Sequence, residues 1–249
     1  MTDGQYIPKV KICGLRDTES ALVAAAAGAD YLGFNFIEGV RRQLKPLDAQ
    51  MVVRGYRIRG NRRAATVQLV PTAFGTRAYG PGGRGRHGDG PLLVGLFKDQ
   101  PAAFVNDVAR LVDLDMVHLC GDEGDTYIRS MWKPVLRQVR VRAGTTPSEV
   151  AAVARPHLDA KRMVVLDRYD EHTPGGAGQT FDWSAAEGVA EQDGVLLAGG
   201  LTPENVTGAI TLLRPWGVDV SSGVETDGVK DHDKIRAFIA AAKAVSATG

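Results

Sequence analysis

One pattern repeats along most of the sequence: a short apolar run, a polar turn, and then a segment with helical periodicity. Short apolar runs of this kind are typical of buried parallel strands, and the segments between them have the length of crossover helices. Eight βα units predict an α/β protein of the (β/α)8 (TIM) barrel class, built as a single domain over residues 1–249. A doubly wound sheet is the alternative, but its dinucleotide fingerprint after the first strand is missing. The first seven predicted strands are Val10–Leu15, Tyr31–Phe36, Leu92–Phe97, Met116–Cys120, Val135–Val141, Met163–Asp167 and Val195–Ala198, and Val218–Gly223 holds the eighth strand and its loop.

The first two predicted helices have clear end signals. Asp17 precedes the alanine-rich segment 19–27, which stops at Gly28, so we expect an aspartate N-cap and a glycine C-cap. Pro46 opens the second helix, which we expect to end near Tyr56.

Residues 57–90 interrupt the pattern with a segment rich in arginine and glycine. Little in this segment can pack, so we predict a flexible insertion before the third strand, in which residues 66–70 could add an edge strand or dock on the body. An RNA-binding tail is the alternative for Arg/Gly-rich sequence, but aromatic residues that would stack on bases are sparse here.

Composition excludes several classes of partner. The net charge of +1 gives no overall field that would recruit nucleic acid or a membrane surface. No apolar run approaches the roughly 18 residues of a membrane span, and the start of the chain lacks a signal peptide pattern. Two cysteines suit a reducing compartment. We therefore expect a cytoplasmic protein, monomeric or homodimeric, without nucleic acid or membrane partners.

The carboxyl ends of barrel strands surround one mouth, and two titratable groups lie at such ends. Cys13 lies near the end of the first predicted strand. It is either a packed core thiol or a base; in the second case Lys11 or another cation would help to generate the thiolate. Asp167 ends the sixth predicted strand, where partial shielding from water favours a neutral carboxyl group and hence a general acid. A helix cap or a solvated loop carboxylate is the alternative for Asp167.

Two glycine-containing loops follow the seventh and eighth predicted strands. Gly199 and Gly200 form the first loop, and Ser221, Ser222 and Gly223 form the second. Their backbone N–H groups are unobstructed, which predicts a phosphate site at the position that barrel enzymes use, although simple turns are the alternative. The histidines lie on separate units without ligand spacing, so we predict no metal site. An acid, a base and a phosphate site together favour isomerisation of a small phosphorylated substrate by proton transfer.

Several motifs in the same order resemble one family. The segments Lys11-Ile12-Cys13-Gly14 and Asp219-Val220-Ser221-Ser222-Gly223-Val224-Glu225 are the most specific of them. The other matching stretches are 28–34, 41–42, 165–167, 175–183, 197–206 and 230–231, which together span nearly the whole chain except the insertion. In these stretches the chain resembles phosphoribosylanthranilate isomerases of tryptophan biosynthesis.

The resemblance implies an Amadori rearrangement of N-(5-phosphoribosyl)anthranilate. In that scheme Asp167 protonates the furanose ring oxygen and Cys13 removes the proton from C2′ of the sugar. No cofactor is needed, because the substrate nitrogen acts as electron sink. Arg42 matches the arginine that pairs with the anthranilate carboxylate, with Arg41 as the neighbouring alternative. The other residues expected to bind substrate are Lys11, Cys120 and the two predicted phosphate loops, Gly199–Gly200 and Ser221–Gly223.

The sequence departs from the family pattern in two places. The family usually has Gln-Leu-His-Gly at the end of the fourth strand, whereas this chain has His118-Leu119-Cys120-Gly121. Cys120 therefore replaces a pocket histidine and removes an imidazole donor, and we expect His118 to face the same side as Cys120. The second departure is the insertion, which falls between a helix and the next strand, at the end of the barrel opposite the mouth; this placement argues against a catalytic lid.

Two alternative functions follow from these departures. The first is a related sugar-phosphate isomerase with a shifted substrate, including the histidine-pathway reaction. That relative uses paired aspartates, so Cys13 argues against it. The second is a non-catalytic barrel that binds RNA or protein through the insertion.

Overall fold

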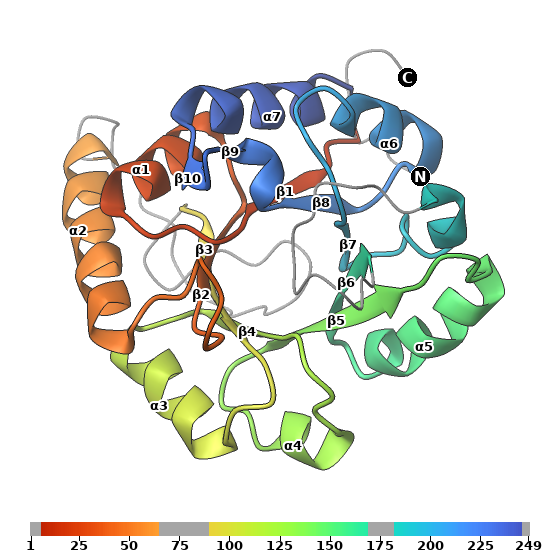
Figure 1. The fold of residues 1–249 in the computed structure, drawn as a ribbon, viewed down its shortest axis with the longest axis horizontal. Helices are drawn as coiled ribbons and strands as arrows, with labels where there is room; N and C mark the ends of the chain where they lie inside the picture. Colours follow the sequence, from red (N-terminus) through yellow and green to blue (C-terminus); the bar gives the residue numbers. More distant parts are fainter. Residues whose placement is uncertain (1–5, 65–89, 169–181, 246–249) are drawn as a thin grey trace, which may run out of the picture.

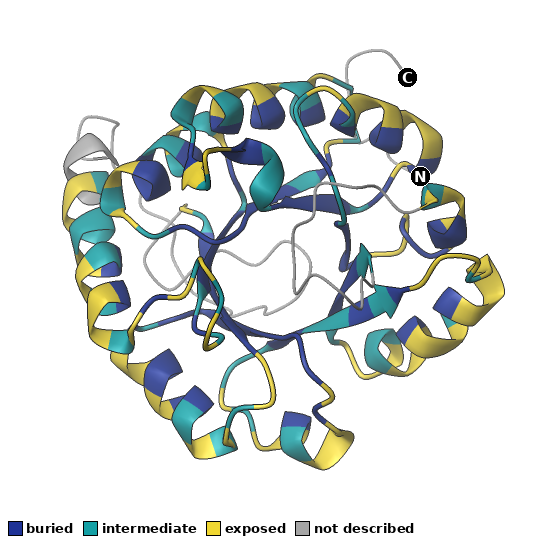
Figure 2. Ribbon diagram, in the orientation of Figure 1, coloured by how far each residue is buried: buried dark blue, intermediate teal, exposed yellow. Residues whose placement is uncertain are grey.

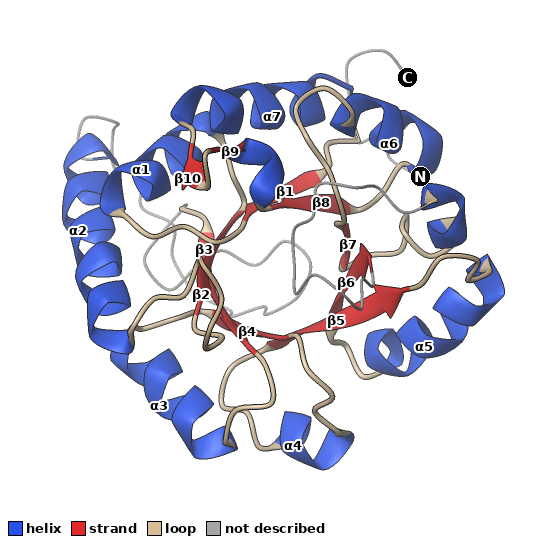
Figure 3. Ribbon diagram, in the orientation of Figure 1, coloured by secondary structure: helices blue, strands red, loops and turns tan. Residues whose placement is uncertain are grey.

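The computed structural model describes residues 6–64, 90–168 and 182–245, and in them the strands β1 to β8 form a closed parallel barrel (Figure 3). Strand β1 pairs with β2 on one side and with β8 on the other, which closes the ring. The predicted barrel class is confirmed. The strands are β1 (Lys9–Ile12), β2 (Tyr31–Asn35), β3 (Leu92–Phe97), β4 (Met116–Leu119), β5 (Val135–Val141), β6 (Met163–Arg168), β7 (Val195–Leu197) and β8 (Gly217–Val220).

Helices surround the ring of strands on the outside (Figure 1). They are α1 (Thr18–Ala27), α2 (Pro46–Ala64), α3 (Ala102–Leu111), α4 (Asp125–Arg129), α5 (Pro147–Asp159), α6 (Val206–Leu213) and α7 (His232–Ala244). Two 3₁₀ turns, η1 (Trp183–Ala186) and η2 (Ser222–Val224), and a hairpin of β9 (Glu225–Thr226) with β10 (Val229–Lys230) complete the described elements. Within the described ranges, none of the helices combines the length and apolar character that a membrane span requires.

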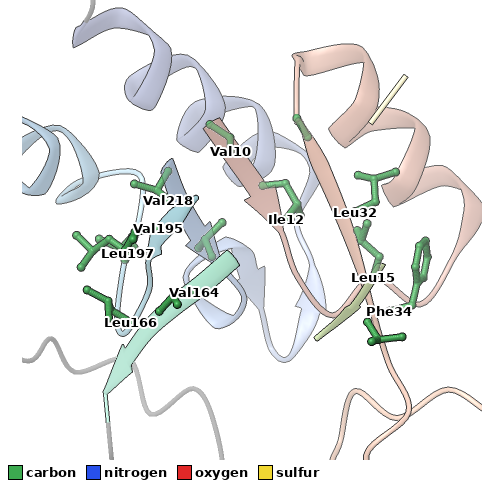
Figure 4. Close-up of a cluster of buried hydrophobic side chains, with 14 of the residues drawn as sticks. Val10, Ile12, Leu15, Leu32, Phe34, Val164, Leu166, Val195, Leu197 and Val218 are labelled. Carbon is green, nitrogen blue, oxygen red and sulfur yellow. The ribbon is translucent and has the colours of Figure 1, made fainter. Parts of the chain in front are cut away.

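Most strand residues are buried on both faces, as Figure 2 shows for the ring, with intermediate exposure along parts of β5 and at the end of β6. One set of strand side chains packs outward against the helices; Figure 4 shows Val10, Ile12 and Val218 in this layer. The alternate set, which includes Tyr31 and Leu136, fills the barrel interior. Burial on both faces explains why the strands appear in the sequence as continuous apolar runs and not as alternating ones.

The local end signals act as the sequence predicts. The Asp17 side chain accepts a hydrogen bond from the Ser20 N–H at 2.7 Å and begins α1. Gly28 ends α1 with φ +101°, a left-handed conformation that glycine adopts without steric cost. Asp182 caps the 3₁₀ turn η1, where its side chain accepts a hydrogen bond from the Ser184 N–H at 3.0 Å.

Several predicted boundaries differ from the structure, and three of them concern the site or the insertion. Strand β1 ends at Ile12 and β4 at Leu119, so Cys13 and Cys120 directly follow their strands and do not end them. Helix α2 continues to Ala64, so the predicted insertion 57–90 begins with helix. The remaining insertion residues 65–89, with the possible edge strand at 66–70, lie outside the described residues, as does the glycine-rich segment 174–178.

The longer α2 has a physical reason in its ion pairs. The Arg57 guanidinium donates to the carboxylate of Asp113 at 2.6 Å and to its carbonyl oxygen at 2.7 Å. Arg59 pairs with Glu19 on α1 at 2.7 Å. The partly buried Arg57 pair attaches the second half of α2 to the segment after α3, whereas the exposed Arg59 pair adds little. The apolar face of α2 is poor, so a search for helical hydrophobic periodicity does not detect this half of the helix.

Candidate active site

The two predicted proton-transfer residues lie at the same end of the barrel. The Cys13 N–H donates to the carbonyl oxygen of Val220 at 2.8 Å, which fixes the loop after β1 against the end of β8. The thiols of Cys13 and Cys120 are buried and belong to one small cluster with Leu96. Asp167 lies half-buried at the end of β6 and acts electrostatically on Cys120. The structure therefore brings the first, fourth and sixth strand ends together at one mouth.

A buried ion pair lies directly beneath Cys13, on the inner side of the barrel. The Lys11 Nζ is 2.7 Å from Asp219 Oδ2, and the exposed fractions of the two side chains are 0% and 7%. Burial opposes the charge on Lys11, but the Asp219 carboxylate and the Cys13 thiol outweigh it and raise the pKa of Lys11. Lys11 is therefore a permanently charged ammonium next to the candidate base.

The pKa of Cys13 reflects two opposing effects. Burial raises the pKa of the thiol, the charge of Lys11 lowers it, and Asp219 raises it again. The Lys230 ammonium also lowers the pKa from the other side of the site. Burial dominates, so the thiol form prevails at neutral pH in the substrate-free protein. The cation predicted from the sequence is present, but it only partly offsets the loss of solvation.

Asp167 has the environment of a general acid. Burial raises its pKa to about 6, and the nearby Asp219 carboxylate acts in the same direction. The N–H of Arg168 donates to Asp167 Oδ1 at 2.9 Å and, with the charge of Lys11, partly opposes this shift. The Gln138 amide donates to Asp167 Oδ2 at 3.1 Å. This carboxyl group therefore keeps its proton to higher pH than a solvated aspartate does.

Arg42 is held beside the mouth by a carboxylate of the same chain. Its Nε and Nη2 donate to Glu225 Oε1 and Oε2 at 2.6 and 2.9 Å, a bidentate arrangement. Lys230 and Arg41 also bind Glu225, at 2.9 and 3.0 Å. Burial raises the pKa of Glu225, but the hydrogen bonds from Arg42 and the charge of Lys230 outweigh it and lower that pKa to about 2. Only 13% of the Arg42 side chain is exposed, against 60% for Arg41, so Arg42 is the inner arginine.

The two predicted phosphate loops lie against each other beside Cys13. Gly199 and Gly200 follow β7 with φ of +83° and +75°, a left-handed turn. A Cβ added at Gly223 would lie 1.9 Å from the carbonyl oxygen of Leu201, so only glycine fits where the second loop touches the first. Ser221 Oγ donates to the Cys13 carbonyl oxygen at 3.3 Å. Ser222 begins η2.

The family of the chain follows from comparison with known proteins. The model of a family described as N-(5'phosphoribosyl)anthranilate (PRA) isomerase matches residues 85–241. An N-(5'-phosphoribosyl)anthranilate isomerase of Roseiflexus castenholzii is 40% identical over 239 residues, which cover 95% of this chain and 99% of the relative. The chain belongs to the N-(5'-phosphoribosyl)anthranilate isomerase family. The family resemblance drawn from the motifs is confirmed.

Other isomerases of this family agree in sequence and in fold. An N-(5'-phosphoribosyl)anthranilate isomerase of Dehalococcoides mccartyi is 36% identical over 234 residues, or 93% of this chain and 94% of that protein. A phosphoribosyl anthranilate isomerase crystal structure from Thermotoga maritima superposes with a TM-score of 0.73 at 32% identity, covering 96% of this chain and all of that one. Another isomerase structure contains reduced 1-(o-carboxyphenylamino)-1-deoxyribulose 5-phosphate; it has a TM-score of 0.67 at 29% identity over 96% and 100% of the two chains.

Cys120 stands where the family usually has a histidine, and its buried thiol has little polar character. The Cys120 thiol is 3.8 Å from the His118 carbonyl oxygen, and burial raises its pKa well above the usual range. His118 faces the interior two residues deeper, as expected, and burial lowers its pKa well below 6.5. Both His118 ring nitrogens are buried without a hydrogen-bond partner in the described part of the chain. His118 is therefore a neutral imidazole in the barrel interior.

Sequence reasoning missed three residues of this site. Asp219 was recognised only as part of a motif. A carboxylate inside the apolar run of β8 is itself a signal, because charged side chains are rarely buried without a partner. Glu225 lies in the same motif, but its partner Arg42 is distant in sequence. Gln138 has no signal beyond its position on an inner face. Among the residues that the structure describes, no cluster of three or more His, Cys, Asp or Glu side chains has the arrangement of a metal site.

Proposed function

We propose that this chain catalyses the Amadori rearrangement of N-(5'-phosphoribosyl)anthranilate to 1-(o-carboxyphenylamino)-1-deoxyribulose 5-phosphate. The observation that carries the proposal is a carboxyl group of raised pKa and a buried thiol at one barrel mouth, next to two glycine loops, in a chain of this family. The relative that was crystallised with the reduced form of this product supports the same substrate class. We further propose that the chain acts as a cytoplasmic monomer or homodimer.

The first step is ring opening by Asp167. The carboxyl proton moves to the furanose ring oxygen, the C1′–O bond breaks, and the nitrogen lone pair forms a Schiff base. A pKa of about 6 suits this step, because the group is a weaker acid than a solvated aspartate and keeps a usable protonated fraction near neutral pH.

The second step is proton abstraction by Cys13. The thiolate takes the C2′ proton, the C–H electrons form the C1′=C2′ bond, and the C=N electrons return to nitrogen. The enol-amine then becomes the ketone as C1′ gains a proton and the enol oxygen loses one, so no proton is gained or lost overall. The charge of Lys11 stabilises the thiolate during this step. The substrate nitrogen accepts the electrons, so the scheme needs no cofactor.

Arg42 and the glycine loops supply binding. The guanidinium has five N–H donors, of which Glu225 occupies one on Nε and one on Nη2. The Nη1 edge can then pair with the anthranilate carboxylate while Glu225 fixes the orientation of the group. The backbone N–H groups at Gly199, Gly200 and the Ser221–Gly223 loop suit the 5′-phosphate. Lys11 and Cys120 contribute charge and shape to the floor of the pocket.

A coupled fluorescence assay of phosphoribosylanthranilate turnover tests the proposal, with Cys13→Ser beside the unmodified chain. We expect turnover by the unmodified chain and a loss of at least 10²-fold in kcat for Cys13→Ser, because a hydroxyl is a far weaker base than a thiolate at the same position. Circular dichroism checks that the variant folds. Full turnover by Cys13→Ser would reject the assigned base.

Cys120 motivates one alternative, a related sugar-phosphate isomerase with a shifted substrate, because it removes an imidazole that family members usually place in the pocket. The aminoaldose of the histidine-pathway reaction, assayed in parallel, distinguishes the two. Turnover of that compound with no turnover of phosphoribosylanthranilate would favour the alternative.

A further inference from the structure

Gln138 lies on the inner face of β5, next to β6, the strand that carries Asp167. It is on β5, opposite Val165 of β6, and Asp167 lies two residues further along β6 on the same inner side (strand positions in Figure 1). Leu136, two residues before Gln138, is opposite His118 of β4. The Gln138 side chain thus points into the barrel and reaches along β6, where its Nε2 lies 3.1 Å from Asp167 Oδ2.

The two oxygens of Asp167 have hydrogen-bond partners of different kinds. Oδ1 accepts from the main-chain N–H of Arg168 at 2.9 Å, and Oδ2 accepts from the Gln138 amide. A main-chain N–H can only donate. A carboxamide carries both a donor and an acceptor, so it can donate to an ionised oxygen through Nε2 and, after rotating its terminal group, accept from an O–H through Oε1. Gln138 can therefore stay bound to Oδ2 before and after the proton leaves.

Within the described part of the chain, other charged and titratable groups act on the Asp167 carboxyl through their charges. These are Asp219 of β8, Lys11 of β1 and Cys120 after β4. They influence how readily the proton leaves, but a charge at a distance does not fix the orientation of the carboxyl group. The hydrogen bond from Gln138 is directional and can do so.

We propose that Gln138 is a positioning residue for the general acid: its carboxamide stays bound to Oδ2 and holds the carboxyl group in one orientation in both protonation states. The proposal rests on the proposed function, in which Asp167 protonates the ring oxygen. Gln138 itself exchanges no proton with the substrate.

Replacement of Gln138 by methionine tests the orienting role. Methionine has nearly the same length but neither donor nor acceptor, so we expect kcat to fall about 10- to 100-fold, as for a misplaced catalytic group, with KM changed less than about threefold. Gln50→Met is the matched control, because the Gln50 amide donates to the Leu111 carbonyl oxygen at 3.0 Å on the outer helices. We expect the control to keep the kcat of the unmodified chain.

A second variant gives a measurement that a purely structural role would not change. Gln138→Glu keeps the shape but places an acceptor and a negative charge against Oδ2, which favours the protonated form of Asp167. We expect the pKa of Asp167 to rise by about one pH unit or more, measured by ¹³C NMR titration of labelled carboxyl groups. The resonance of Asp167 is assigned by its loss in Asp167→Asn.

These measurements separate the inference from the proposed function. A Gln138→Met variant with unchanged kcat, or a Gln138→Glu variant with an unchanged Asp167 titration, overturns the positioning role even if the isomerase activity is present. Absence of phosphoribosylanthranilate turnover in the unmodified chain would reject the proposed function, and the titration would still decide the inference. If Gln138→Met does not fold, Gln138→Asn, whose shorter amide cannot reach Oδ2, replaces it in the kcat comparison.

Discussion

Cys13 and Asp167 are held in the protonation states opposite to those that the reaction uses. Burial raises the pKa of the Asp167 carboxyl to about 6, and burial also raises the pKa of the Cys13 thiol above its ordinary range. Because the pKa of the carboxyl stays below that of the thiol, the thiolate paired with a protonated carboxyl is a minor form of the singly protonated enzyme. Small changes in either environment therefore change the concentration of the reactive form directly.

This arrangement predicts a bell-shaped dependence of kcat/KM on pH. Below the acid limb both Asp167 and Cys13 carry protons, so the base is missing; above the alkaline limb both are ionised, so the acid is missing. We expect the acid limb near pH 6 and the alkaline limb at higher pH than an ordinary solvated thiol would give, as apparent values of the coupled pair. The measurement is kcat/KM between pH 5 and about pH 10 in buffers of constant ionic strength.

Asp219→Asn supplies the control for this profile. Removing the Asp219 carboxylate lowers the pKa of Asp167, so the acid limb should move to lower pH. A profile of the unmodified chain that stays flat through pH 6 would contradict the assignment of Asp167.

At the scale of elements, the segment from β8 through η2 to β10 organises one wall of the site. Glu225 at the start of β9 binds Arg42 from the loop after β2 and Lys230 from β10. Lys230 also donates to the Ser221 carbonyl oxygen at 2.7 Å. One carboxylate thus connects the loop with the candidate carboxylate-binding arginine to the loop with the candidate phosphate site.

The inner and outer arginines on this wall should behave differently. We expect Arg42→Ala to raise KM for phosphoribosylanthranilate about 10- to 100-fold with a smaller effect on kcat, because it removes a charge-assisted contact to the substrate carboxylate. Arg41→Ala, at a mostly exposed side chain that shares Glu225, should change KM less than about threefold. Steady-state kinetics of the two variants in parallel give the comparison. A larger KM effect for Arg41→Ala would assign the carboxylate partner to Arg41.

The elements themselves could be predicted from the sequence because each depends on local signals. The strands are apolar runs, and α1 has its aspartate and glycine caps, so the barrel and the positions of Cys13 and Asp167 followed. Helix α2 was predicted too short because ion pairs to other elements stabilise its second half, and such partners have no local signal.

The hydrogen-bond partners in the site could not be predicted in the same way. Gln138 contacts Asp167 across 29 positions of the sequence, and that contact depends on the register of β5 with β6. The pairing of Arg42 with Glu225 spans 183 positions. A pattern along the chain indicates which face a residue occupies, but not which distant side chain meets it.

At the scale of the whole molecule, the ring closes where the first and last barrel strands meet. Lys11 of β1 is opposite Asp219 of β8, and their side chains form the buried ion pair at that seam. Asp219 Oδ1 is buried without a hydrogen-bond partner among the described residues, so the pair depends on the single 2.7 Å contact and on charge. The same two residues thus belong both to the closure of the barrel and to the electrostatics of Cys13 and Asp167.

A double-mutant cycle on this pair tests whether it stabilises the closed ring. Lys11→Met leaves a buried carboxylate and Asp219→Asn leaves a buried ammonium, so each should lower the free energy of unfolding by about 3–5 kcal/mol. The double variant removes both charges, so it should lose several kcal/mol less than the sum of the two singles. Urea unfolding followed by circular dichroism gives the three differences. Additive losses would mean that the two charges are stabilised independently by their surroundings, and the ion pair would then not be what holds β1 against β8.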